Sequence, residues 1–481
     1  MKNYVVSGYE PKKLFEFFED ICAIPHGSGN EKGIADYLVA FAEARGIECH
    51  RDAIDNVFYR IPATAGRENE PSVLLQGHTD MVCEKNSDSN HDFLRDPLDL
   101  YVDEKGNLRA RGTTLGGDDG IAVAAMMAVA DGMVESHPAI ECLFTVSEET
   151  GLDGANGFDY SLIKSRILLN MDSEEEDAVI VGCAGGVRSD LLVTPAYVSG
   201  CGNAYEISLR GLRGGHSGED IAKGRANANL LMGRIFLRLL SVGEFSIASL
   251  RGGSKENAIP RECRATVVFP LEKAEAFVTA ARDEIARIEK ELSAEDSSFV
   301  GEISETEAVT RMISAEDTRR IATLLGCVRN GVLRMSTRVK GFTEWSRSLG
   351  VLYTEDEQVH IVFSSRSAIE AQLDASIAEL DAWVATVGGT ANHYGRYPGW
   401  DYNPDSPVRE KYLRICREEL GIEATARVIH AGLECGVIAS HLPGLDAISF
   451  GPNMADIHSP DEALDLASVE RFWKKLVAML A

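Results

Sequence analysis

The sequence predicts an α/β fold whose chain is interrupted by an inserted α+β domain. Up to about residue 186, apolar runs with strand character alternate with helical patterns, as expected of a layered α/β domain. Residues 187–399 instead combine half-exposed strands with a long charged helix, which favours an α+β arrangement. Residues 400–481 then return to the first pattern. We therefore expect residues 1–186 and 400–481 to form one domain in two segments.

The elements of the first segment follow from the spacing of its apolar residues. One helix face is marked by Leu14, Phe17, Phe18 and Ile21, which recur at helical intervals. A buried helix is expected at residues 120–130 (GIAVAAMMAVA), after a glycine-rich turn. Strands are expected at residues 56–61, 72–76, 139–146 and 166–171. The last two are continuous apolar runs, which suits central strands covered on both faces.

The insert and the last segment are assigned in the same way. In the insert, strands are expected at residues 204–209, 264–269 and 360–364, and helices at 224–240, 271–292, 318–325 and 369–385. Residues 392–407 (NHYGRYPGWDYNPDSP) are rich in Gly, Pro, Asn and aromatic residues, which predicts a connection back to the first domain. A helix at 408–420, a strand at 447–450 and an amphipathic helix at 467–480 follow.

Composition excludes several classes of function. Lys and Arg number 48 against 75 Asp and Glu, which gives a net charge of −27. Such an acidic surface repels phosphate backbones and anionic lipid, so we expect neither a nucleic-acid nor a membrane partner. No apolar run is long enough to span a bilayer, and the first residues lack a secretion signal. Together with ten scattered cysteines and no CxxC pair, this predicts a cytoplasmic protein with reduced thiols.

Polar clusters mark the ends of the predicted strands. The clusters are GHTDMV at 77–82, GTTLGGDDG at 112–120, SEETG at 147–151, NMDS at 170–173 and GPNMADIHSP at 451–460. The second opens a helix and the other four each directly follow a predicted strand. Ligands of open α/β sheets bind beyond the carboxyl ends of the strands, so these clusters are expected to form one site.

The residue types in these clusters indicate a metal site. They supply two imidazoles and six carboxylates: His78, His458, Asp80, Asp118, Asp119, Glu148, Glu149 and Asp172. Carboxylates gathered so densely repel one another unless a cation lies among them. A mixed His and carboxylate set suits Zn²⁺, Co²⁺ or Mn²⁺. Two imidazoles fit two ions, one imidazole each, with one Asp bridging them.

A two-metal site also needs a base that is free of the metal. Such a site lowers the pKa of a bridging water and polarises a carbonyl. The adjacent pair Glu148 and Glu149 suits this division, with one carboxylate a ligand and the other a proton shuttle. Asp80 follows His78 by two residues and could accept its second ring N–H.

The ordered set GHTDMV, LGGDDG, SEETG, NMDS and IHSP resembles the M20 family of co-catalytic zinc peptidases. Within that family it resembles the aminoacyl-histidine (Xaa-His) dipeptidase branch, on the stretches GTTLGGDDGIAVA, RGLRGGHSGEDI and HAGLECG. The resemblance implies a zinc-peptidase-like catalytic domain, with a mixed central sheet flanked by helices, interrupted by an α+β lid domain. It implies as metal ligands His78, Asp118, Glu149, Asp172 and His458, with Asp118 bridging two ions and joined to Asp119 by a cis peptide.

The resemblance also implies roles for other residues. The reaction would be dipeptide hydrolysis by a metal-bridged water, with Glu148 as general base and Asp80 orienting a ligand. In the lid, which would also form a homodimer, His216 of GGHSG would stabilise the oxyanion. The substrate-binding residues would be Asn257 and Arg366, for the terminal carboxylate, and His430 and Glu434, with Glu434 facing a free amino group.

Simpler interpretations remain open for the single motifs. His78 and Asp80 could be a buried hydrogen-bonded pair, Asp118 and Asp119 a turn and helix N-cap, and Glu148 and Glu149 a solvated pair. Two alternative functions also stay open. One is an amidohydrolase or deacylase acting on N-acyl amino acids, and the other is a catalytically silent metal-binding scaffold.

Overall fold

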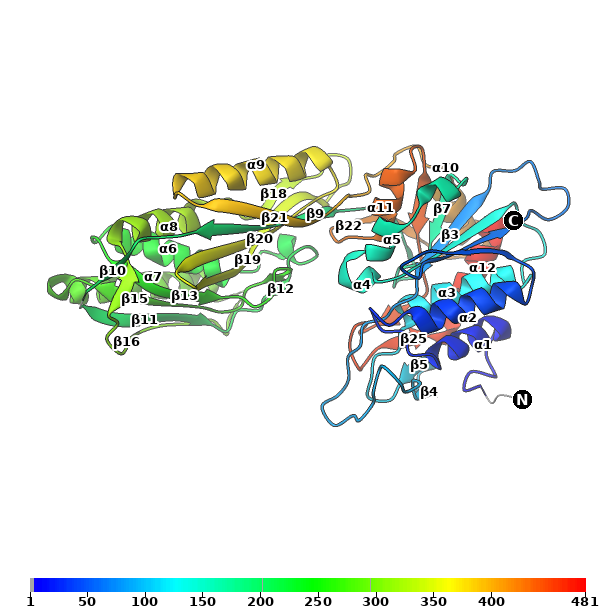
Figure 1. Ribbon diagram of the computed structural model, residues 1–481, viewed down its shortest axis with the longest axis horizontal. Helices are drawn as coiled ribbons and strands as arrows, with labels where there is room; N and C mark the ends of the chain where they lie inside the picture. Colours follow the sequence, from blue (N-terminus) through cyan, green and yellow to red (C-terminus); the bar gives the residue numbers. More distant parts are fainter. Residues whose placement is uncertain (1–3, 201, 295) are drawn as a thin grey trace. The chain divides into compact units, whose positions relative to one another are not determined.

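The computed structural model describes residues 4–200, 202–294 and 296–481, which form two compact units (Figure 1). Unit 1 comprises Met1–Cys183, Trp400–Val428 and Leu433–Ala481, and unit 2 comprises Ala184–Gly399 and Ile429–Gly432. The chain therefore returns to unit 2 for four residues within its last segment, a crossing that the sequence pattern did not reveal.

A mixed sheet forms the centre of unit 1. Its strand order is β1-β2-β6-β3-β7-β23-β8-β22. The strands are β1 (Glu48–Arg51), β2 (Val57–Ile61), β3 (Val73–His78), β6 (Ile140–Thr145), β7 (Ile167–Asn170), β8 (Ala178–Cys183), β22 (Thr425–Ile429) and β23 (Asp446–Ser449). The neighbours β6, β3, β7 and β23 run parallel, and the outer pairs β1–β2 and β2–β6 are antiparallel. The predicted mixed sheet is confirmed.

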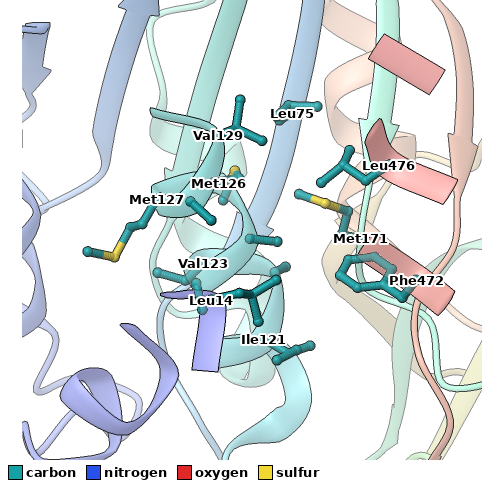
Figure 2. Close-up of a cluster of buried hydrophobic side chains, with 14 of the residues drawn as sticks. Leu14, Leu75, Ile121, Val123, Met126, Met127, Val129, Met171, Phe472 and Leu476 are labelled. Carbon is teal, nitrogen blue, oxygen red and sulfur yellow. The ribbon is translucent and has the colours of Figure 1, made fainter. Parts of the chain in front are cut away.

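Helices cover this sheet and complete its core. The central helix α3 (Gly117–Ala130) is buried from Gly117 through Val129, as expected for a helix enclosed on every side. Figure 2 shows Leu75 of β3 beside α3, and Met171 next to Phe472 and Leu476 of α12. The other helices are α1 (Lys12–Cys22), α2 (Lys32–Glu43), α4 (Glu148–Gly151), α5 (Asp153–Gly157), α10 (Pro407–Ile415), α11 (Glu434–His441) and α12 (Leu466–Leu480).

A small second sheet of unit 1 carries one of the functional loops. Its order is β24-β25-β5-β4, from β24 (Met454–Ala455), β25 (Ala463–Asp465), β5 (Asn107–Ala110) and β4 (Leu100–Val102). The loop between β24 and β25 contains His458. The pairing of β25 with β5 holds this loop beside the segment that leads into α3.

Unit 2 is built on an antiparallel sheet of order β16-β11-β15-β13-β19-β20-β9-β21, with β18 paired to β19. Its strands are β9 (Gly185–Val193), β11 (Asn203–Arg210), β13 (Ser246–Gly252), β15 (Cys263–Phe269), β16 (Val300–Glu305), β18 (Gly331–Met335), β19 (Thr343–Glu355), β20 (Gln358–Ser367) and β21 (Thr390–Tyr397). The short pairs are β10 (Tyr197–Ser199) with β17 (Arg311–Ile313), and β12 (Gly215–His216) with β14 (Ala258–Ile259). The helices are α6 (Ala228–Leu240), α7 (Ala274–Leu292), α8 (Ala315–Cys327) and α9 (Glu370–Thr386), which share one apolar core with the sheet.

The expected α/β and α+β classes are confirmed, and two local expectations are corrected. The helix expected from residue 224 begins at Ala228, because the Asn227 side chain accepts hydrogen bonds from the first backbone N–H groups and caps it there. The expected connection at 392–407 begins inside β21, whose residues pair with β9 at the edge of the sheet. Among the described residues, no helix is both long and apolar enough to cross a membrane.

Candidate metal centre and active site

The carboxyl ends of the parallel strands in unit 1 bring the predicted polar clusters together. His78 is the last residue of β3 and pairs with Thr145, the last residue of β6. Glu148 and Glu149 open α4 just beyond β6. Asp172 follows β7, whose register pairs Asn170 with Gln76 of β3. Parallel strands end at the same edge of a sheet, so all three clusters face one region.

Asp118 lies between the two imidazoles. Its Oδ1 is 3.1 Å from His78 Nε2, and its Oδ2 is 3.1 Å from His458 Nε2. His458 Nε2 is also 2.8 Å from Glu149 Oε1. One carboxylate thus offers one oxygen toward each imidazole, which is the arrangement a bridging ligand requires. The peptide bond between Asp118 and Asp119 is cis, as the family resemblance implies.

A second group involves Asp119, which the sequence analysis did not assign as a ligand. Potential ligand atoms of His78, Asp118 and Glu149 lie within 4.8 Å of one another, and so do those of His78, Asp119 and Asp172. Asp119 accepts a hydrogen bond from the backbone N–H of His78, and its other oxygen has no partner among the described residues. A side chain at Gly77 would come within 2.5 Å of Asp119, so the glycine of GHTD allows this approach.

The charges of this group call for cations. Burial raises the pKa of Asp119 well above its usual value, and the nearby Asp172 adds to the rise. Burial likewise raises the pKa of Asp172, together with the charge of Asp118. Hydrogen bonds to Asp118 and Glu149 raise the pKa of His458 to about 11. Several buried carboxyl groups, one of which has an oxygen without a partner among the described residues, fit a site for divalent metal ions. The imidazoles beside them favour Zn²⁺ and similar transition metals.

Asp80 and Glu148 lie beside these potential ligands. His78 Nδ1 is 3.0 Å from the backbone oxygen of Asp80 and 3.4 Å from its carboxylate. That carboxylate also accepts hydrogen bonds from the Ser28 hydroxyl and from the backbone N–H groups of Glu148 and Glu149. Burial raises the pKa of Glu148 well above its usual value, and the neighbouring acids Asp172, Glu434 and Glu149 reinforce the rise.

Glu434, the first residue of α11, is completely buried and contacts side chains of β3 and β6. One oxygen, Oε2, accepts hydrogen bonds from the Thr145 hydroxyl at 2.7 Å and from the Gln76 side chain. The other oxygen has no partner among the described residues. Burial raises the pKa of this carboxyl to about 7. A buried acid with a free oxygen is suited to receive a positively charged group.

Glu462 is a structural residue of the site that sequence reasoning missed. Its buried carboxylate accepts hydrogen bonds from the backbone N–H groups of Leu115, Gly116 and Gly117, at 2.7, 3.1 and 2.9 Å. It thereby shapes the turn that presents Asp118. Its position four residues after His458 was the only available signal, because its partners lie some 345 residues away in the sequence.

In unit 2, a separate polar group gathers around Arg366 of β20. Arg366 is only 7% exposed. Its Nη1 donates to the Tyr397 hydroxyl at 2.9 Å, and its Nη2 lies 3.4 Å from His216 Nε2. His216 Nδ1 accepts from the backbone N–H of Glu219 at 3.2 Å, which favours the tautomer with the ring proton on Nε2. Burial, with the charge of Arg366, lowers the pKa of His216 to about 4, so this ring is neutral.

The other predicted residues of unit 2 lie close to this group in the fold. His430 is buried, with Nε2 2.7 Å from the Ser346 hydroxyl, and burial lowers its pKa to about 3, helped by Arg366 and His216. Asn257 is exposed, and its backbone oxygen accepts from the N–H of Ser217. Because β12 and β14 pair His216 with Ala258, the segments that carry His216 and Asn257 lie side by side.

Comparison with known proteins gives four findings. A sequence model of the peptidase family M20/M25/M40 matches residues 74–481. The chain is 36% identical to the cytosol non-specific dipeptidase of Escherichia coli K12, over 99% of this chain and 98% of that protein. The crystal structure of aminoacylhistidine dipeptidase from Vibrio alginolyticus matches with a TM-score of 0.89 and a sequence identity of 37%, and the match covers 98% of this chain and 97% of that one. An aminopeptidase from Bacillus cereus, at 16% identity and a TM-score of 0.57, shares the fold.

Proposed function

This chain belongs to peptidase family M20/M25/M40, and from that premise we propose how its side chains hydrolyse a dipeptide. The family expected from the sequence is confirmed. The chain is a dipeptidase, because the two relatives that match it over nearly their whole length are a cytosol non-specific dipeptidase and an aminoacylhistidine dipeptidase. That likeness over the whole chain is the observation that carries the proposal.

The chain is a metal-dependent hydrolase, and the finer proposal is that it holds two divalent ions. His458 and Glu149 would hold one ion, His78 and Asp172 the other, and Asp118 would bridge them. Support comes from the two oxygens of Asp118, each of which faces one imidazole. The mixed imidazole and carboxylate set favours Zn²⁺, with Co²⁺ or Mn²⁺ as alternatives that elemental analysis distinguishes.

Such ions, when bound, polarise the scissile carbonyl and lower the pKa of the attacking water. We assign to Glu148 the transfer of the proton from that water to the leaving amine. In support, burial and neighbouring acids make this carboxyl a better proton acceptor than an exposed glutamate. Asp80 keeps the base in place, since it accepts from the backbone N–H of Glu148 while lying beside the ring of His78.

The carboxylate end of the substrate is assigned to unit 2. Arg366 would bind the terminal carboxylate, assisted by Asn257 and His430, and His216 would donate its Nε2 proton to the developing oxyanion. In support, Arg366 is buried, and among the described residues no carboxylate forms an ion pair with it. A buried guanidinium without an anion is unfavourable, and a substrate carboxylate would relieve it.

The amino end of the substrate is assigned to Glu434. This carboxylate is buried, is held by Gln76 and Thr145, and keeps one oxygen free. Recognition of a free ammonium separates a dipeptidase from a deacylase of N-acyl amino acids, because an acylated amine carries no charge. The arrangement of Glu434 therefore favours the dipeptidase over that alternative.

A panel of matched substrates tests this assignment. With Zn²⁺, Co²⁺ or Mn²⁺ supplied, the enzyme should hydrolyse free dipeptides, both histidine-containing and not. Acetylation of the amino end should lower kcat/KM roughly 10²-fold or more, because Glu434 would be left without its cation. Equal rates on the acetylated substrate would instead indicate a deacylase, and no hydrolysis of any substrate would indicate a silent scaffold.

We also propose that unit 2 acts as a lid and forms a homodimer, and that the enzyme works in the cytoplasm. The family resemblance supports the first two roles, and the cytosol dipeptidase of Escherichia coli supports the third. Sedimentation analysis of the full chain would test the dimer. A monomer at micromolar concentration would contradict it.

A further inference from the structure

The hydrogen bond from Arg366 to Tyr397 joins side chains that lie in register across three strands of unit 2. The register pairs Tyr397 of β21 with Gly186 of β9, and Gly186 with Arg366 of β20. The three residues therefore form one row across neighbouring strands. Val359, Ile361 and Phe363 of β20 enter the core that contains the helices, so strand alternation puts Arg366 on the opposite face.

Glycines make room for the tyrosine in this row. A side-chain carbon at Gly186 would lie 2.7 Å from the Tyr397 hydroxyl oxygen and 2.8 Å from its ring. A side-chain carbon at Gly432 would also come within 2.8 Å of the ring. Because both residues lack a side chain, the Tyr397 ring crosses β9 and its hydroxyl reaches the guanidinium at 2.9 Å.

The guanidinium is confined on its other side as well. A side-chain carbon at Gly218 would lie 3.1 Å from Cδ and Nε of Arg366, so the arginine stem rests against this glycine. Nη1 donates to Tyr397, Nη2 lies near His216, and Nε has no partner among the described residues. Among the described residues, the only group that holds the arginine through a hydrogen bond shorter than 3 Å is the neutral Tyr397 hydroxyl, which leaves the positive charge of Arg366 available to an anion.

We propose that Tyr397 is a positioning residue that orients Arg366 for the terminal carboxylate of the substrate and so sets the affinity for dipeptides. This inference rests on the proposed role of Arg366. A guanidinium already held in one orientation loses less side-chain entropy when it binds a carboxylate in bidentate fashion. Tyr397 would therefore act on substrate binding and leave the proton transfer by Glu148 of unit 1 unchanged.

The test compares Tyr397→Phe, which removes only the hydroxyl, with the wild-type enzyme. KM for a free dipeptide should rise about 5- to 10-fold while kcat stays within about twofold, since one hydrogen bond to a charged group is lost. For the corresponding dipeptide amide, which has no terminal carboxylate, the variant should match the wild type. Tyr353→Phe, a hydroxyl deletion on β19 where the ring stacks on His360, serves as control and should leave both substrates unaffected.

A double-mutant cycle separates this inference from the proposed function beneath it. Arg366→Ala should raise KM for the free dipeptide, and adding Tyr397→Phe to it should cause no further rise. If Arg366→Ala leaves KM unchanged, the assigned role of Arg366 is wrong. If Arg366→Ala raises KM but Tyr397→Phe alone does not, or if Tyr397→Phe affects the amide equally, the positioning role is overturned.

Discussion

In unit 1 the polar group at the sheet edge consists of several acids and two imidazoles, whereas the polar group around Arg366 in unit 2 consists of one guanidinium and two imidazoles. Burial acts on both groups but moves their pKa values in opposite directions. It raises those of Asp119 and Asp172, and it lowers those of His216 and His430. The buried carboxylates Asp119 and Asp172 are therefore suited to bind cations, and the buried guanidinium of Arg366 is suited to bind an anion.

The two groups are also built by different means. Most acids of unit 1 follow parallel strands that end at one edge, and Asp118 and Asp119 join them from the first turn of α3. Arg366 and Tyr397 of unit 2 project from strands β20 and β21. They meet across the intervening strand β9, where Gly186 is paired with both of them. We expect the first group to depend on its bound ions for stability and the second to depend on sheet register.

Removal of divalent ions should produce the largest effect, and it tests whether unit 1 needs bound cations. Prolonged chelation should abolish hydrolysis, because the reaction depends on the ions. It should also lower stability by about 3 kcal/mol for each ion, relative to protein saturated at 100 times the dissociation constant, because an ion that binds only the folded state stabilises it. Calorimetry with and without added Zn²⁺ measures this. An unchanged unfolding temperature would show that the acids of unit 1 need no ion.

Glu148→Gln should separate the base from the ligands within unit 1. The loss of general-base catalysis should lower kcat roughly 10³-fold, while the number of bound ions per chain stays the same. Glu149→Gln is the matched comparison, because this residue lies 2.8 Å from His458 and should lose metal as well as activity. A Glu148 variant that keeps more than about a tenth of the wild-type rate contradicts the assignment.

Glu462→Ala tests whether the turn before Asp118 is held by tertiary contacts. Three backbone N–H groups would lose their acceptor, which should lower the free energy of unfolding by about 3 kcal/mol. Glu418→Ala, whose ion pair with Arg417 is exposed, should change it by less than about 0.5 kcal/mol. Urea denaturation of both variants gives the comparison, and equal effects would dismiss the role of Glu462.

The pH dependence of stability should reveal the smallest effect, in unit 2. His430 has a pKa of about 3 in the folded protein and an ordinary value near 6.5 when unfolded. The unfolded state therefore binds a proton first as the pH falls, so this contribution to stability is complete above about pH 6.5 and declines below it. At pH 5 the expected loss is about 2 kcal/mol.

His430→Gln removes this titration. The variant should lose less stability than the wild type between pH 7.5 and pH 5, as measured by urea denaturation at both values. His50→Gln, an exposed histidine in β1, should behave as the wild type does. If the His430 variant declines as steeply as the wild type, the buried neutral histidine is not the source of acid sensitivity.

Much of unit 1 could be predicted because its signals are local. The apolar runs that became β3, β6 and β7 are continuous, and the polar clusters follow them directly. The approach of Asp119 to His78 and Asp172 was harder to see, because a helix-cap residue and a residue of a metal-ligand cluster look alike in sequence. Strand β21 was hidden for a similar reason, since its glycine and aromatic residues resemble a connection.

By itself, the sequence determined the order of elements, the two fold classes and the kinds of side chain that gather at the sheet edge. These depend on residue spacing and on polar residues at strand ends, which are properties of short segments. Only the tertiary structure decided that Asp118 faces both imidazoles, that Glu462 supports its turn, and that Tyr397 reaches Arg366. Each of these depends on packing or strand register between segments that are distant in the chain. Patterns within a short segment cannot show which distant segment it will contact.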